Sequence, residues 1–171
     1  MEVINFAEQK LILTNIEPNI NANSEEQADV LIQRLGLMPR KKGSTERMNK
    51  VLIELYERAK DAARQKNPTK SIITVEDMAY FAGITRQTMY DYLKRWLDLD
   101  LITKTSYIGQ DNKVVIGYKL NGNTLELAFE KARARINNNL DLTLKYIREL
   151  QKTLKNEKIS KSQKSRDKEN S

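Results

Sequence analysis

The sequence contains no cysteine and no histidine. It therefore has no disulfides, no thiol nucleophile, no imidazole acid or base and none of the usual zinc ligand sets. Glycine is scarce, and none of the six glycines forms the G-x-G-x-x-G or G-x-x-x-x-G-K spacing that cradles phosphates. We therefore expect no enzyme, no metal site, no cofactor and no bound small molecule.

Long hydrophobic runs are also missing. Glu2, Glu8 and Lys10 interrupt the first ten residues, unlike the apolar region of a signal peptide, and no run approaches the length that spans a bilayer. We expect a soluble, cytoplasmic protein. Positive charge is abundant, with a net charge of +7 and a pI near 9.5. Such a balance favours anionic partners, such as nucleic acid or an anionic membrane surface.

Residues 74–99 predict two short helices joined by a tight turn. Thr74 is suited to cap a helix over 75–81, and Gly83 supplies a turn at which a positive φ costs little. Thr85 is suited to cap a second helix. The apolar residues of that helix recur at i, i+3, i+4 and i+7 and form one face: Met89, Tyr92, Leu93 and Trp96.

The order Ala79, Gly83-Ile84, Met89 and Tyr92-Leu93 resembles the helix-turn-helix signature of transcription regulators. Residues 101–120, two β-rich runs around Gly109-Gln110-Asp111-Asn112, resemble the wing of a winged helix. The resemblance covers residues 45–120. It implies a mainly α fold with a small β wing (α+β), in the winged helix-turn-helix superfamily of prokaryotic-type regulators. A helical hairpin within a larger bundle and an ordinary surface hairpin are the alternatives.

The flanks divide the chain further. Residues 1–43 form an N-terminal segment, with a helix over 24–35 that starts at a capping box from Ser24 to Gln27 and stops at Gly36. Its first 23 residues are either a partly ordered leader or a strand or arm that docks on a partner. The basic hinge at 39–43 either contacts phosphates or is a solvated linker.

The predicted domain occupies residues 44–121. Its first helix covers 46–66, is capped by Ser44 or Thr45, and ends at Asn67-Pro68 because the residue before proline avoids the α region. Residues 71–73 are a short β-type segment that would add a strand to the wing sheet.

Residues 122–155 predict a long helix, capped by Asn123 with Glu126, that Asn137-Asn138-Asn139 could kink or end. About thirty residues would extend about 45 Å, longer than a winged-helix body. We therefore expect a homodimer, with packing inside the monomer as the alternative. The contact residues would be Leu125, Phe129, Ile136, Leu140, Leu144 and Ile147. Residues 156–171 read as a basic disordered tail.

The resemblance implies that the second helix of the motif, over 85–98, reads double-stranded DNA in the major groove. Arg86 suits guanine and Gln87 suits adenine. The other expected DNA-binding residues are Thr85, Thr88, Tyr90, Lys94 and Arg95 on the helix, with Lys104, Gln110, Asn112 and Lys113 on the wing. Such a protein would associate with the nucleoid and need no membrane partner. The alternatives are a plasmid or virus replication or partition factor, and a winged-helix module that binds proteins without touching DNA.

Overall fold

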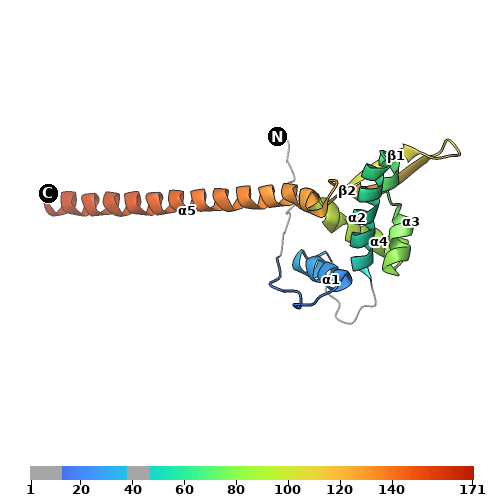
Figure 1. Cartoon of the computed structure of the whole chain (residues 1–171). Helices are drawn as coiled ribbons and strands as arrows, with labels where there is room; N and C mark the ends of the chain where they lie inside the picture. Colours follow the sequence, from blue (N-terminus) through green and yellow to red (C-terminus); the bar gives the residue numbers. More distant parts are fainter. Residues whose placement is uncertain (1–12, 38–46) are drawn as a thin grey trace. The chain divides into compact units, whose positions relative to one another are not determined.

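The computed structural model describes residues 13–37 and 47–171 (Figure 1). The described residues form five α-helices, one short 3-10 helix and one two-stranded antiparallel sheet, which confirms the predicted α+β class. The chain divides into two compact units, Met1–Ala132 and Arg133–Ser171. The hinge expected at 39–43 and the caps expected at Ser44 or Thr45 lie outside the described residues.

The first unit contains α1 (Ser24–Arg34), α2 (Met48–Arg64), α3 (Val75–Ala82), α4 (Arg86–Asp98) and the start of α5 (Leu125–Glu169). Helix α2 packs against α1 and α3, and α3 packs against α4. Apolar side chains from all these helices meet in one core, because each helix buries one stripe. The largest fully buried members include Trp96, Ile32, Leu37, Met48, Leu55, Met78, Met89 and Leu93.

The α3–turn–α4 pair has the predicted caps. Thr74 and Thr85 accept hydrogen bonds from the N–H groups of Asp77 and Thr88, each at 3.2 Å. Gly83 lies in the left-handed region with φ 69°, and the Ile84 N–H donates to the Ala79 carbonyl at 3.0 Å. That bond and the left-handed glycine end α3 and turn the chain directly into α4.

The caps of α1 and α5 and the end of α2 differ from prediction. Helix α1 is capped by Asn23, not Ser24: Asn23 Oδ1 accepts from the Glu26 N–H at 2.9 Å, and Glu26 Oε2 accepts from the Asn23 N–H at 3.2 Å. Asparagine caps as well as serine, and glutamate at the third position completes the box. Helix α2 ends two residues early, because Lys66 adopts a positive φ of 52°. Thr124, not Asn123, accepts from the Leu127 N–H and caps α5.

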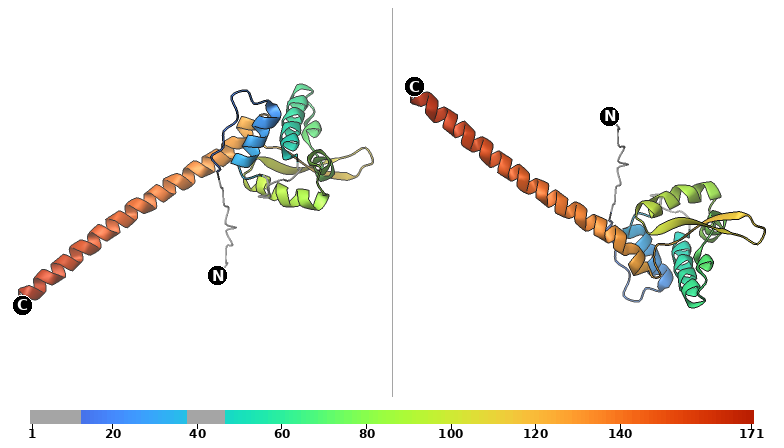
Figure 2. Two further views of the ribbon diagram at one scale, coloured as in Figure 1. Left: turned by 90° about the horizontal axis from the view of Figure 1, so that it is seen from below. Right: turned by 90° about the horizontal axis from the view of Figure 1, so that it is seen from above.

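The hairpin consists of β1 (Ile102–Ile108) and β2 (Val114–Leu120), which pair from Ile102–Leu120 at the base to Ile108–Val114 near the turn. In both views of Figure 2 its turn lies beyond the helices of the first unit. Gly109 N–H donates to the Lys113 carbonyl at 2.8 Å and closes the turn.

A third segment joins the sheet at one residue. Ile73 and Tyr118 exchange two backbone hydrogen bonds of 2.8 Å, so the predicted β-type segment is present as a single bridge. Ser71 belongs to the 3-10 helix η1 (Pro68–Ser71). The bridge needs glycine at 117, because a Cβ there would lie 2.5 Å from Ile72 Cγ2 and 2.7 Å from the Ile73 carbonyl oxygen.

Helix α5 (Leu125–Glu169) corrects the prediction for the C-terminal region. It passes through Asn137-Asn138-Asn139 and beyond residue 155 without a break, so residues 156–169 are helical where a disordered tail was predicted. The chain has no glycine or proline after Gly122, and lysine, arginine, glutamate and glutamine favour helix locally. Disorder was predicted from the scarcity of apolar residues, but the helix propensity of this segment prevails.

Candidate nucleic-acid interface

Helix α4 has one buried face and one exposed face. Met89, Leu93 and Trp96 are buried in the core of the first unit. Opposite them the predicted contact residues are exposed, except Thr88, which is half-buried: Thr85, Arg86, Gln87, Tyr90, Lys94 and Arg95. None of the residues that the structure describes covers Arg86, Gln87 or Lys94. The helix thus presents polar and cationic side chains on a rigid, core-anchored support.

Arg86 is held by two neighbours. Its Nε lies 3.1 Å from Glu76 Oε1, and an Nη atom donates to the Tyr90 hydroxyl at 3.2 Å, with the guanidinium carbon 5.6 Å from the Tyr90 ring centroid. The hydrogen bond with Tyr90, and then the Glu76 carboxylate, raise the pKa of Arg86. Arg86 is therefore cationic and oriented. The sequence did not predict Glu76 as the partner of Arg86, because Glu76 lies on a different helix, α3.

The C-terminal half of α4 is tied to the N-terminal segment. An Arg95 Nη atom donates to the Gly36 carbonyl at 3.1 Å, and Trp96 Nε1 donates to the Leu37 carbonyl at 3.4 Å. Both carbonyls follow the end of α1, where Gly36 has φ 64°. Arg95 thus has a structural contact within the first unit. Its contact with the DNA backbone stays a prediction, and the side chain would have to make both contacts.

The hairpin carries its predicted polar residues on the surface: Lys104, Gln110, Asn112 and Lys113 are all exposed. Lys104 pairs with Tyr118 in the strand register. Burial, and then interaction with Tyr90 of α4, raise the pKa of Tyr118. Lys104 therefore lies opposite Tyr118 in the sheet, and Tyr118 interacts with Tyr90 of α4.

Three exposed apolar residues share the sheet face of Lys104 and Tyr118. Ile108, Val114 and Ile116 are 71%, 67% and 55% exposed. Successive residues of a strand alternate between faces, so these residues and Lys104 point to the same side. None of the three was predicted as a contact residue, although the period of two in both strands was the signal that would have identified them.

The residues expected in a dimer contact fall into two groups. Leu125 and Phe129 are half-buried and pack against the core of the first unit, together with the fully buried Ala128 and Ala132. These two residues therefore serve packing within the monomer. Ile136 is half-buried in the second unit, and Leu140, Leu144 and Ile147 are exposed there.

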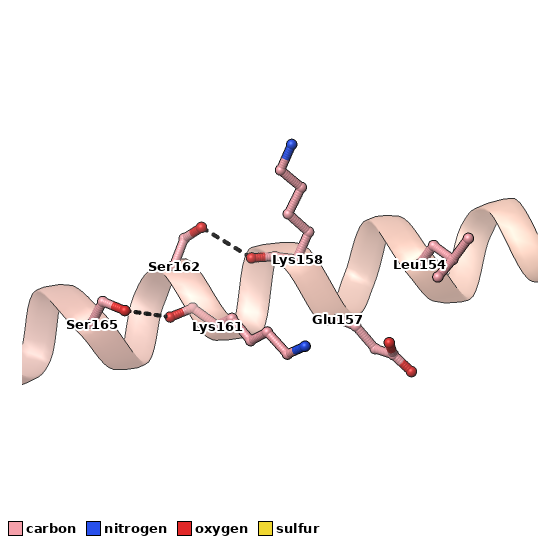
Figure 3. Close-up of a pocket in the computed structure, with 6 residues that line it drawn as sticks. All are labelled: Leu154, Glu157, Lys158, Lys161, Ser162 and Ser165. Carbon is pink, nitrogen blue, oxygen red and sulfur yellow. Dashed lines mark hydrogen bonds between the residues drawn. The ribbon is translucent and has the colours of Figure 1, made fainter.

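Two further features of the described ranges concern metal binding and surface hollows. Within them no group of three or more acidic side chains is arranged to hold a metal ion. A shallow hollow runs along α5 between Leu154 and Ser165 (Figure 3). All its lining residues come from this one helix, and the Ser162 and Ser165 hydroxyls each donate at 3.0 Å to a carbonyl one turn back. The hollow is an open helix surface.

No protein-family model, curated protein or solved structure matches the chain. Within residues 13–37 and 47–171, none of the helices combines the length and the apolar character needed to cross a bilayer.

Proposed function

We propose that this protein is a winged-helix DNA-binding protein, and that it regulates transcription. In this proposal α2, α3 and α4 are the three helices, β1–β2 is the wing, and α4 enters the major groove of double-stranded DNA. The observation that carries the proposal is the exposed face of α4, where Arg86 and Gln87 follow a capped N-terminus. Side chains at the start of such a helix reach base edges.

The chemistry of each residue supports its role. Arginine donates in a bidentate manner to guanine O6 and N7, and glutamine pairs with adenine N6 and N7. Lys94 lies two turns further along α4, where a cation suits phosphate. Lys104 and Lys113 supply further cations on the hairpin, and Ile108 and Val114 offer apolar contact for sugars or thymine methyl groups.

The experiment is selection from a random duplex library with the full chain, followed by titration of the enriched duplex and a scrambled one. An enriched sequence is expected. Arg86→Ala should then cost about 1–3 kcal/mol on the enriched duplex, and much less on the scrambled one. Arg64→Ala is the matched control, since Arg64 is an exposed arginine on α2, with its side chain 75% exposed.

Two results would count against the proposal. Absence of binding to any duplex at low salt would remove DNA as the partner and favour a module that binds proteins. Equal losses for Arg86→Ala and Arg64→Ala would mean that α4 does not read the sequence.

A further inference from the structure

The second unit, Arg133–Ser171, carries a stripe of exposed apolar side chains along α5. Leu140 and Leu154 are 62% and 55% exposed, and Leu144, Ile147 and Leu150 lie between them. With Ile136, successive members are three or four residues apart, so they lie on one side of the helix. Contiguous exposed apolar side chains of this kind mark an interaction surface.

The charges of the same region avoid this side completely. If Leu140, Ile147 and Leu154 take position a of a heptad, then Ile136, Thr143 and Leu150 take position d. Every charged residue from 137 to 156 then falls at b, c or f: Asp141, Lys145, Arg148, Glu149, Lys152 and Lys155. Positions e and g hold only neutral residues: Asn137, Asn139, Leu144, Tyr146, Gln151 and Thr153. The stripe and both its flanks are thus free of charge.

The stripe has a defined beginning and end. Beyond Leu154, the a and d positions are occupied by Glu157, Lys161, Lys164 and Lys168. Before Ile136, position a holds Arg133, and the preceding d residue, Phe129, packs against the core of the first unit. The eighteen-residue step from Ile136 to Leu154 covers about 27 Å of helix.

We propose that a second copy of this chain packs along Ile136–Leu154 as a parallel coiled coil. Two uncharged stripes with neutral flanks meet without like charges at any e or g position. Thr143, the one polar residue at a or d, already donates its hydroxyl to the Asn139 carbonyl at 2.8 Å, so its burial leaves no unpaired donor. This inference is independent of the proposed DNA binding.

The parallel direction follows from the ends of the stripe. In an antiparallel pair centred on it, residues 157–168 of one copy would lie along residues 122–133 of the other. There Ala128 and Ala132 are buried and Phe129 is half-buried in the core of the first unit. A parallel pair requires no contact with that segment. In a parallel pair the lysines at 161, 164 and 168 would face the same lysines of the other copy. Because like charges repel, pairing should stop at Leu154.

The first test is the mass of the full chain by sedimentation equilibrium from about 1 to 100 µM. Twice the chain mass of 19.8 kDa is expected. Ile147→Lys places an ammonium group in the stripe and should raise the dissociation constant at least about 30-fold. Leu142→Lys is the matched control, because Leu142 is 45% exposed on the same helix but lies at position c, and it should have no effect.

The second test uses the absence of cysteine. Thr143→Cys should form an interchain disulfide under mild oxidation, because residue 143 faces its own copy in a parallel, in-register pair, whereas an antiparallel pair centred on the stripe would place it against residue 147. Lys145→Cys, at position f, should not. Fluorescence of the single, fully buried Trp96 reports that the first unit stays folded in every variant.

Three outcomes would overturn the inference. A monomeric wild-type chain at 100 µM would remove the second copy as the occupant of the stripe. Equal weakening by Leu142→Lys and Ile147→Lys would show that another surface associates. A dimer in which Thr143→Cys does not cross-link would overturn the parallel arrangement.

Discussion

At the scale of single residues, the arginine expected to read bases is already engaged. Arg86 forms an ion pair with Glu76 and a hydrogen bond with Tyr90. Both contacts lie at the surface, where solvent screens the ion pair. They orient the guanidinium, but the carboxylate also repels an approaching phosphate. Removal of the negative charge of Glu76 should therefore raise the affinity of α4 for DNA.

Glu76→Gln should tighten DNA binding about 2- to 5-fold at low salt, because it removes a negative charge and releases Arg86 from its ion pair. Anisotropy titration with the enriched duplex measures the change. Glu57→Gln alters the net charge equally at an exposed position on α2. An equal gain from that control would assign the effect to total charge and not to Arg86.

Gly117 sets the close contact between β2 and the Ile72-Ile73 segment. Gly117→Ala should lower the free energy of unfolding by about 1–3 kcal/mol, because its Cβ would clash with Ile72 Cγ2 and the Ile73 carbonyl. Urea unfolding followed by Trp96 fluorescence measures this. Ser106→Ala, at an exposed position of β1, should change little, and a comparable loss there would contradict the explanation.

At the scale of elements, α4 combines a proposed DNA contact with a structural one in adjacent residues. Lys94→Gln should weaken binding to all duplexes alike and lower the slope of log K against log salt by about 0.9. Arg95→Gln should instead lower the free energy of unfolding by about 0.5–1.5 kcal/mol, since the bond to Gly36 is weakened. Salt titration and urea unfolding of both variants separate the roles, and exchanged results would refute this division.

The hairpin is the second element of the proposed interface, and its exposed apolar residues distinguish it from a purely cationic wing. Ile108→Thr combined with Val114→Thr keeps β propensity and should leave stability within about 0.5 kcal/mol, because both residues are exposed. Affinity for the enriched duplex should fall about 3- to 10-fold if these side chains contact DNA. Unchanged affinity would leave them available to a protein partner.

At the scale of the whole molecule, the lysines after the apolar stripe are spread over about half of the circumference of the helix. Lys155, Lys158, Lys161 and Lys164 are spaced by three, and each step turns about 300° around the helix axis. They therefore face successively different directions. A single DNA surface can meet only some of them.

Deletion of residues 156–171 should lower the salt slope of DNA binding by about 1–3 units, although it removes five lysine or arginine charges. The ratio of specific to non-specific affinity should stay constant or rise, since the base contacts are proposed on α4. Parallel salt titrations on the enriched and scrambled duplexes measure both quantities. An unchanged slope would mean that this segment does not meet phosphate.

Local chemistry made much of the fold predictable. The caps at Thr74 and Thr85, the turn at Gly83 and the two strands follow from side chains that act within a few residues. The errors arose where neighbouring residues compete for one role, as Asn23 does with Ser24 and Thr124 with Asn123. The predicted end of α5 was wrong because the scarcity of apolar residues was given more weight than the helix propensity of a segment without glycine or proline.

The sequence by itself determined the two faces of α4, the caps of α3 and α4 with the turn between them, and the apolar and charged sides of α5, because all of these depend on spacing along the chain. The tertiary structure alone decided that Glu76 holds Arg86, that Arg95 donates to Gly36, and that Leu125 and Phe129 pack in the first unit. The physical reason is the separation of the partners. Arg95 and Gly36 are 59 residues apart, far beyond the reach of helical or strand periodicity.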